Sequence, residues 1–297
     1  MIVQLIQFSA SFVRHQTRNS SKNLLKSPLV GSRPVPKSSR RPRYYNMNNT
    51  NLLLKQLLFP GLDLHTRCRY RFLPKFFRSG TLDTLDAGCG NGALAYAAYQ
   101  KGNRVLGLTY NNQETAKCSA LFSFLRTDPS RLEFQSYNLY ELPKLGKQFD
   151  QIICSETLEH IREDGLILQS FYDLLRPNGV LHLCCPYALH PEHHLGRIDN
   201  PEDGGHVRDG YTLESYRELL EPIGFQLIQA VGLGSPLLVQ LDRAVRRLRG
   251  LGGDAAAFPL FLFSWPLQLF DFIDPPEPFS LYVQAVKPPA ASSTSLA

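Results

Sequence analysis

Residues 85–92 read LDAGCGNG, with glycine at three alternate positions. A short run that can extend as a strand, 81–85, leads into them, and residues 93–99 (ALAYAAY) are rich in helix formers. Alternate glycines let a backbone turn tightly and approach a ligand without an intervening Cβ atom. The free N–H groups of the following helix then point at that ligand. The pattern predicts a nucleotide-type site at the carboxyl end of the first strand of an open α/β sheet.

The glycine spacing distinguishes between nucleotide ligands. A dinucleotide-binding turn reads G-x-G-x-x-G, whereas this turn reads G-x-G-x-G and carries Asp86 on its strand side. An acid there suits a ligand with a positively charged amino-acid end. The stretch resembles motif I of the class I S-adenosylmethionine-dependent methyltransferases, whose usual form is (hydrophobic)-D-x-G-C-G-x-G. The resemblance implies S-adenosylmethionine as cofactor, with Asp86 orienting its amino group and with loop contacts at Gly88, Cys89 and Gly90.

Residues 104–109 (RVLGLT) read as the second strand. Most members of the family end this strand in Asp or Glu, which grips both ribose hydroxyls, whereas this chain has Thr109. The string from Gly107 to Gln113 resembles the G-(hydrophobic)-T-x-x-x-Q variant of the cyclopropane fatty acid synthase branch. That resemblance implies that Thr109 and Gln113 serve the ribose. The alternative is that Thr109 only caps the next helix.

The third strand is expected over 132–137, followed by a string similar to the family's D-x-x-x-L-P. The resemblance implies that the Asn138 amide oxygen and the Leu139 backbone N–H hold the adenine. The string FDQIICSETLEHI at 149–161 closely matches the family's fourth strand and turn, and its Ser155 is assigned to the cofactor site.

Residues 174–181 (LLRPNGVL) resemble the family's L-(K/R)-P-G-G-x-L, a helix end, a turn and the fifth strand. Further strands are expected at 225–231 and 280–286, the last one antiparallel. Four motifs in order across residues 80 to 190 imply a doubly wound, seven-stranded Rossmann-like methyltransferase sheet with helices on both faces.

The loop after the fifth strand, 185–212, is long, and long loops are usually functional. It opens where the methyl acceptor should lie and holds four of the chain's histidines. We predict His206 as the general base, with His194 as second choice, because the pKa of histidine lies near neutrality. The alternative is that His206 and Arg208 only tie the loop to the sheet. No two histidines have convincing ligand spacing, so we expect no metal.

Two segments before the glycine loop, 51–61 and 62–78, look like helices that lead into the core. In related folds such a helix packs over the cofactor, and Arg67 or Arg71 is a candidate for its carboxylate. The alternative is a solvated basic face. The six cysteines show no metal-ligand or disulfide pattern, so we expect small buried residues of a reduced compartment.

Charge is divided unevenly along the 297 residues. Residues 1–46 hold nine Lys and Arg and no acid, which leaves 23 basic and 26 acidic residues in the remainder. We interpret 1–46 as a disordered basic leader, with a transit peptide or a mis-assigned start before Met47 as alternatives. The methyltransferase domain is expected over 47–290 and a disordered tail over 291–297. We expect a cytoplasmic protein, or an organellar one if the leader is a transit peptide.

An insertion, 232–278, separates the last two expected strands. It combines a helix over 237–249 with four arginines, a glycine break, and an aromatic run at 258–270 that holds the chain's single tryptophan. Basic residues followed by an aromatic segment suit a membrane surface. Contact through 237–270 with a membrane or lipid substrate, a cap over the active site, and a dimer seam are the alternatives.

The function expected from these features is methyl transfer from S-adenosylmethionine to a small-molecule or lipid-linked acceptor, on oxygen or nitrogen. One alternative is a carbon methyltransferase of cyclopropane-synthase type. Another is a non-catalytic cofactor-binding protein that acts through its insertion. Nucleic acid is not an expected partner, because the body is acidic and carries no N-P-P-Y-type motif.

Overall fold

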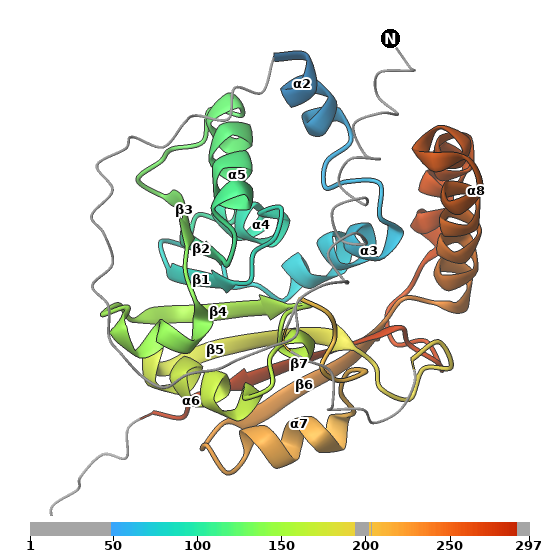
Figure 1. The fold of residues 1–297 in the computed structure, drawn as a ribbon. Coiled ribbons are helices and arrows are strands. Elements are labelled where there is room, and N and C mark those ends of the chain that lie inside the picture. The colour runs from blue at the N-terminus through green and yellow to red at the C-terminus, as the bar shows by residue number, and fades with distance from the viewer. Residues whose placement is uncertain (1–48, 194–201, 203, 290–297) are drawn as a thin grey trace, which may run out of the picture.

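The computed structural model describes residues 49–193, 202 and 204–289, and its centre is one mixed sheet (Figure 1). The strand order is β3-β2-β1-β4-β5-β7-β6. The strands are β1 (Asp83–Ala87), β2 (Arg104–Thr109), β3 (Leu132–Ser136), β4 (Phe149–Ser155), β5 (Leu175–Pro186), β6 (Gln226–Leu233) and β7 (Ser280–Val286). Strands β1 to β5 pair in parallel, and β7 pairs antiparallel with both β5 and β6. The predicted fold class is confirmed.

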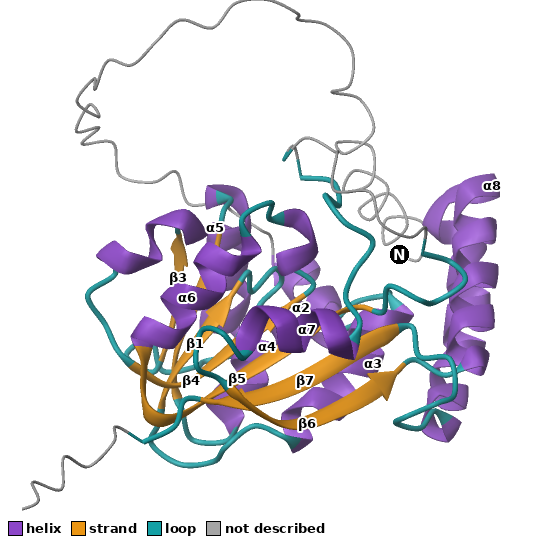
Figure 2. Cartoon of the chain, turned by 90° about the horizontal axis from the view of Figure 1, so that it is seen from below, coloured by secondary structure: helices purple, strands orange, loops and turns teal. Residues whose placement is uncertain are grey.

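Helices cover both faces of this sheet (Figures 1 and 2). They are α2 (Asn49–Leu57), α3 (Leu64–Phe72), α4 (Ala93–Gln100), α5 (Asn112–Phe124), α6 (Asp164–Leu174), α7 (Leu213–Leu220) and α8 (Pro236–Leu267). Short 3-10 turns add η1 (Leu73–Lys75), η2 (Leu139–Lys144), η3 (Leu158–His160) and η4 (Gln268–Phe270). One buried apolar cluster joins the sheet to α6 and α7, and a second joins it to α3, α4, α5 and α8. The central strands read as apolar runs because both of their faces are covered.

The two leading helices are shorter than the sequence indicated. Pro60 and Gly61 separate α2 from α3, and Asp63 caps α3 by accepting from the Thr66 N–H at 2.6 Å. Pro74 lies in η1, just beyond the end of α3, because proline cannot continue a helix. The first strand lies two residues later than expected, at Asp83–Ala87.

The segment between β6 and β7 forms α8, which stands beside α3 at one side of the sheet (Figures 1 and 2). Non-helical backbone angles at Gly252 and Gly253 divide it into two limbs. The ion pair between Arg249 and Asp254, at 2.7 Å, spans this break. None of the helices within the described ranges is long and apolar enough to cross a membrane.

All six cysteines are buried free thiols, as expected from their scattered positions. Several other sequence predictions lie outside the described residues: the leader over 1–46, His194, and the tail over 291–297.

Candidate active site

Three glycines of the loop after β1 adopt positive φ, at +80° for Gly88, +51° for Gly90 and +76° for Gly92. A Cβ atom on Gly88 would lie 2.1 Å from the hydroxyl oxygen of Thr157, and one on Gly92 would lie 2.6 Å from the ring of Phe122. A Cβ atom on Gly90 would meet no described atom within 4 Å. Packing therefore requires glycine at 88 and 92, whereas Gly90 faces space that a ligand can fill.

The backbone of Cys89 holds this loop in its turn through hydrogen bonds. Its N–H and the N–H of Gly88 both donate to the Leu108 carbonyl, at 2.8 and 2.9 Å. Its carbonyl accepts from the Gly92 N–H at 2.8 Å, and burial raises the pKa of its thiol well above the usual range. The backbone groups of Cys89 thus bind within the loop and its side chain is buried, so the expected contact of Cys89 with the cofactor stays a prediction.

Asp86 is 2% exposed at the end of β1, directly before the loop. Its Oδ2 atom has no hydrogen-bond partner in the part of the chain that the structure describes. Burial raises the carboxyl pKa from 3.8 to about 7, although the backbone N–H of Ala95 lowers it in part. A buried, incompletely paired carboxylate beside an open glycine loop fits the positively charged amino group of an S-adenosylmethionine.

The end of β2 differs from the expected arrangement. Asn111 is the N-cap of α5 and accepts from the Gln113 N–H at 2.7 Å, so the alternative that Thr109 caps this helix is wrong. The Thr109 hydroxyl instead donates to Glu114 Oε2 at 2.9 Å. Gln113 is exposed, whereas Glu114 is half-buried. Glu114 was not among the residues predicted for the site, because it lies five residues beyond the strand, in the first turn of α5.

The two predicted adenine contacts begin η2, after β3. The Asn138 side-chain oxygen already accepts from the Tyr140 N–H at 3.1 Å, which leaves it one further lone pair. Leu139 is the first residue of η2, a position whose N–H has no acceptor within a helix. Both residues can therefore still meet the edge of a base.

The end of β4 brings a basic side chain into the site. Ser155 Oγ and Glu156 Oε1 are buried without a hydrogen-bond partner among the described residues. Glu156 adopts φ +52°, and its Oε2 lies 3.3 Å from Arg69 Nη1 of α3. Burial alone would lower the pKa of Arg69, but the Glu156 carboxylate together with Cys184, Asp63 and Cys68 outweighs burial and raises it. Arg69 is therefore a fixed cation at the carboxyl end of the sheet.

Arg67 and Arg71, the predicted partners of the cofactor carboxylate, brace the insertion instead. Arg67 stacks over the rings of Phe261 and Trp265, with 5.1 and 4.5 Å to the ring centroids. Arg71 donates to the Leu269 carbonyl at 3.0 Å. Arg69 lies two positions from each of them and therefore points to another side of the helix, which has 3.6 residues per turn.

The loop after β5 places His206 beside the turn after β4. The rings of His206 and His160 meet edge to face with centroids 4.6 Å apart, and His160 Nε2 lies 3.7 Å from Glu159 Oε1. Glu159 is fully buried; burial, with the charge of Glu156, raises its pKa to about 8. These titratable groups lie at the carboxyl ends of the strands, where the methyl acceptor was expected.

Arg208 fixes this part of the loop, with its side chain only 11% exposed. Its guanidinium pairs with Asp164 and donates to the Arg162 carbonyl at 2.9 Å and the Leu158 carbonyl at 3.2 Å. The Tyr211 hydroxyl donates to the same Asp164 carboxylate at 2.7 Å. Arg208 is therefore the anchor that joins the loop to η3 and α6. The alternative stated for Arg208 from the sequence, that it ties the loop to the sheet, described a similar role.

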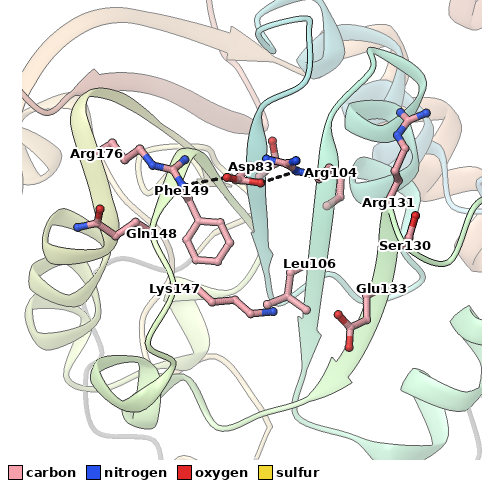
Figure 3. Close-up of a pocket in the computed structure, with 12 residues that line it drawn as sticks. Asp83, Arg104, Leu106, Ser130, Arg131, Glu133, Lys147, Gln148, Phe149 and Arg176 are labelled. Carbon is pink, nitrogen blue, oxygen red and sulfur yellow. Dashed lines mark hydrogen bonds and ion pairs between the residues drawn. The ribbon is translucent and has the colours of Figure 1, made fainter.

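A hollow of about 330 Å³ lies at the opposite, amino end of the strands (Figure 3). Asp83 accepts from Arg104 at 2.8 Å and from Arg176 at 2.9 Å across it. Arg176 also pairs with Asp150 at 2.9 Å. These charges satisfy one another, and the hollow is separate from the residues at the carboxyl edge.

The sequence profile of the methyltransferase domain matches residues 63–230, more than half of the chain. The chain belongs to the class I S-adenosylmethionine-dependent methyltransferases. The matched region contains the glycine loop, the ends of β2 to β4 and the loop after β5, and it stops before the insertion. The predictions of an enzyme with S-adenosylmethionine as cofactor are confirmed.

Two relatives and one solved structure illustrate the similarity. A "probable S-adenosylmethionine-dependent methyltransferase" of Mycolicibacterium smegmatis is 29% identical over 177 residues, 55% of this chain and 65% of the relative. The ubiquinone biosynthesis O-methyltransferase of Histophilus somni is 35% identical over 99 residues, 33% of this chain and 42% of the relative. The chain thus spans less than two thirds of either methyltransferase.

The structure of Haemonchus contortus phosphoethanolamine N-methyltransferase 2 in complex with S-adenosyl-L-methionine has the same fold. The TM-score is 0.51 at 18% identity, covering 81% of this chain and 57% of that one.

Proposed function

We propose that this methyltransferase transfers a methyl group to an oxygen atom of a small apolar or lipid-linked acceptor. The observation that carries the proposal is the group formed by Glu159, His160 and His206 at the open end of the sheet, next to the cofactor loop. The name of the Histophilus relative supports oxygen over nitrogen as the acceptor atom. The cyclopropane-type alternative loses support, since Thr109 is engaged by Glu114 instead of facing a ligand.

The cofactor lies across the carboxyl ends of β1 to β4 in this proposal. Asp86 meets its amino group, and Arg69 meets its carboxylate, because Asp86 is a buried acid with an unpaired oxygen directly before the loop and Arg69 is a fixed cation at the end of β4. Glu114 takes the ribose hydroxyls, and Asn138 with Leu139 takes the adenine edge. Gly90 and Ser155 line the space between these groups.

S-adenosylmethionine supplies an activated methyl group, so the protein's main task is to align the acceptor with it. The acceptor oxygen must also lose a proton as it attacks. His206 is exposed to the acceptor side and fixed by the anchored loop, and we assign it the role of general base. His194, the second candidate, lies outside the described residues.

The first test replaces His206 with alanine. We expect turnover of a phenolic acceptor to fall by about 100-fold, the usual size of a lost acid–base contribution. Affinity for S-adenosylmethionine, measured by calorimetry, should stay within about twofold, since His206 lies on the acceptor side. His193→Ala is the matched control, because that imidazole belongs to the same loop but packs on Phe279 at 4.7 Å. Full turnover by His206→Ala would remove the residue from the reaction.

We further propose that the second limb of α8 rests on a membrane surface and receives a lipid-linked acceptor there. One face of that limb is buried at positions 257, 261 and 264, and η4 continues this face at position 268. The other face and the following turn expose large apolar side chains. We call this group the apolar ridge: Leu262, Phe263, Trp265, Leu269, Phe270, Phe272 and Ile273.

The charges of α8 fit an anionic lipid surface. Arg246 and Arg247 are exposed on the first limb, whereas both acids of α8, Asp242 and Asp254, are buried in ion pairs. Exposed apolar patches of this kind usually mark an interaction site, and neighbouring basic residues favour anionic headgroups. Arg67 and Arg71 connect the limb to α3, so the membrane-facing element is joined to the helix that carries Arg69.

A Phe263→Glu/Phe270→Glu variant tests the membrane contact. Wild-type protein should sediment with vesicles that contain one quarter phosphatidylglycerol, and the variant should lose most of this binding because two charges would enter the acyl boundary. Leu166→Glu is the control, since Leu166 is 61% exposed on α6. Equal sedimentation of wild type and the double variant, or a dimer of the wild type that the double variant breaks, would overturn the membrane proposal.

A further inference from the structure

Three side chains from distant parts of the sequence converge on one point. Glu159 and His160 lie in η3, and His206 lies in the loop after β5. One ligand-type atom of each, an oxygen or a ring nitrogen, lies within 4.8 Å of the other two.

The burial of Glu159 requires an explanation. The residue is 0% exposed, and its carboxylate has only weak partners among the described residues, the Cys185 thiol and its own backbone N–H. An unpaired buried carboxylate is costly, and native structures normally pair such groups or bind a metal with them. Glu159 Oε1 is directed toward His160 Nε2, at 3.7 Å, which is too long for a hydrogen bond.

His160 is oriented as a metal-binding histidine is. Its Nδ1 lies 3.0 Å from the Gly205 carbonyl, which can only accept, so Nδ1 carries the proton and Nε2 presents a lone pair. Ligand histidines usually donate their second nitrogen in this way. Two ligands at about 2.1 Å from one tetrahedral ion lie roughly 3.4 Å apart. The 3.7 Å between Glu159 Oε1 and His160 Nε2 is close to that separation.

Backbone contacts hold the third side chain, His206, close to Glu159 and His160. The Val207 N–H, one residue beyond His206, donates to the Glu159 carbonyl at 2.8 Å. The anchor residue Arg208 joins the same segment to α6 through Asp164. His206 therefore belongs to a braced segment, and the group is organised before any ligand arrives.

We propose that Glu159, His160 and His206 bind one divalent transition-metal ion whose remaining positions are open to the methyl acceptor. Two imidazoles and one carboxylate suit Zn²⁺, Mn²⁺ or Fe²⁺ better than Ca²⁺, which prefers oxygen ligands.

The role of the ion rests on the proposed function. An acceptor hydroxyl that binds the ion loses its proton to water or buffer, and the oxyanion attacks the methyl carbon. The new C–O bond forms while the electron pair of the C–S bond returns to sulfur. A metal-bound oxygen loses its proton more readily because the cation stabilises the negative charge. With the ion bound, His206 acts as its ligand, and this role replaces the general-base role proposed above, since one nitrogen lone pair cannot do both.

The test titrates Zn²⁺ and, separately, Mn²⁺ into the full chain after EDTA treatment and dialysis, without cofactor or acceptor. We expect one ion per chain by calorimetry and by elemental analysis. His206→Ala and Glu159→Gln should each weaken binding by about tenfold or more, and His193→Ala should not. Glu159→Gln keeps the buried shape, and His206→Ala changes an exposed residue, so at least one of the two remains folded.

The outcomes separate the ion from the proposed function. No stoichiometric binding by the wild type, or equal weakening in His193→Ala, overturns the metal site even if S-adenosylmethionine binds and phenols are methylated. Stoichiometric binding that depends on His206 supports the site even if no phenol is methylated, which would instead overturn the proposed acceptor. If the wild type methylates a phenol, loss of its turnover in EDTA with unchanged S-adenosylmethionine affinity supports the ligand role of His206. Turnover that persists in EDTA overturns that role.

Discussion

Asp86→Asn is expected to weaken S-adenosylmethionine binding by about 100-fold, while the chain without cofactor becomes no less stable at pH 8. A charge-assisted hydrogen bond contributes about 1.5–3 kcal/mol, which corresponds to roughly 10- to 150-fold in affinity. Asparagine preserves the shape of the side chain but cannot offer a negative charge to the cofactor's amino group. It also removes a buried carboxylate whose Oδ2 has no partner among the described residues. The substitution should therefore lower the affinity for S-adenosylmethionine without lowering the free energy of unfolding.

The pH dependence of the wild type follows from the same group. The carboxyl pKa of Asp86 is raised from 3.8 to about 7 by burial, so the folded chain holds an extra proton between these values. The free energy of unfolding contributed by Asp86 is thus fully present below pH 3.8 and is lost as the pH rises to about 7. S-adenosylmethionine binding should show the opposite trend and weaken below pH 7, where Asp86 is neutral. The Asp86→Asn variant should lose both dependences.

Calorimetric titration between pH 5.5 and 8.5 and urea unfolding over the same range would measure both effects. Asp83→Asn is the control, because Asp83 lies at the other end of β1 and pairs with Arg104 and Arg176. It should reduce stability slightly and leave cofactor affinity unchanged. Wild-type affinity in Asp86→Asn would show that this carboxylate does not meet the cofactor.

Arg208→Ala is expected to lower the free energy of unfolding by about 3 kcal/mol or more, the usual cost of breaking a buried ion pair. The substitution leaves Asp164 without its guanidinium and removes donors from the Leu158 and Arg162 carbonyls. It also releases the loop that carries His206. We therefore expect turnover to fall by about tenfold or more even in the fraction that remains folded, because a misplaced reacting group loses its alignment.

Urea unfolding and initial-rate measurements at a temperature below the transition would separate the two losses. Arg217→Ala is the control, since Arg217 is half exposed and pairs loosely with Glu214 at 3.7 Å. A double-mutant cycle with Asp164→Asn should give a coupling free energy of about 1–3 kcal/mol. Additive effects in that cycle, or an unchanged turnover, would show that Arg208 does not position the loop.

The glycine loop and the strand order could be predicted from the sequence because both depend on local patterns. Apolar runs with turn signals between them define five parallel strands, and G-x-G-x-G after the first strand defines a cofactor loop. The site residues were less predictable. The helix that carries Arg69 was identified, but which of its arginines pairs with Glu156 depends on how α3 is rotated against the sheet, and the spacing of charges did not reveal that rotation.

The sequence by itself determined the family, the sheet, the cofactor and the acid that begins its site. Tertiary structure decided which glycine faces open space, which arginine of α3 pairs with Glu156, and that Glu114 of α5 binds Thr109 at the end of β2. It also brought His206 to Glu159 across 46 intervening residues. Local patterns determine strands and turns because they involve neighbours in the chain. A site at the end of a parallel sheet gathers loops from several strands, and only the packed sheet fixes which of their side chains meet.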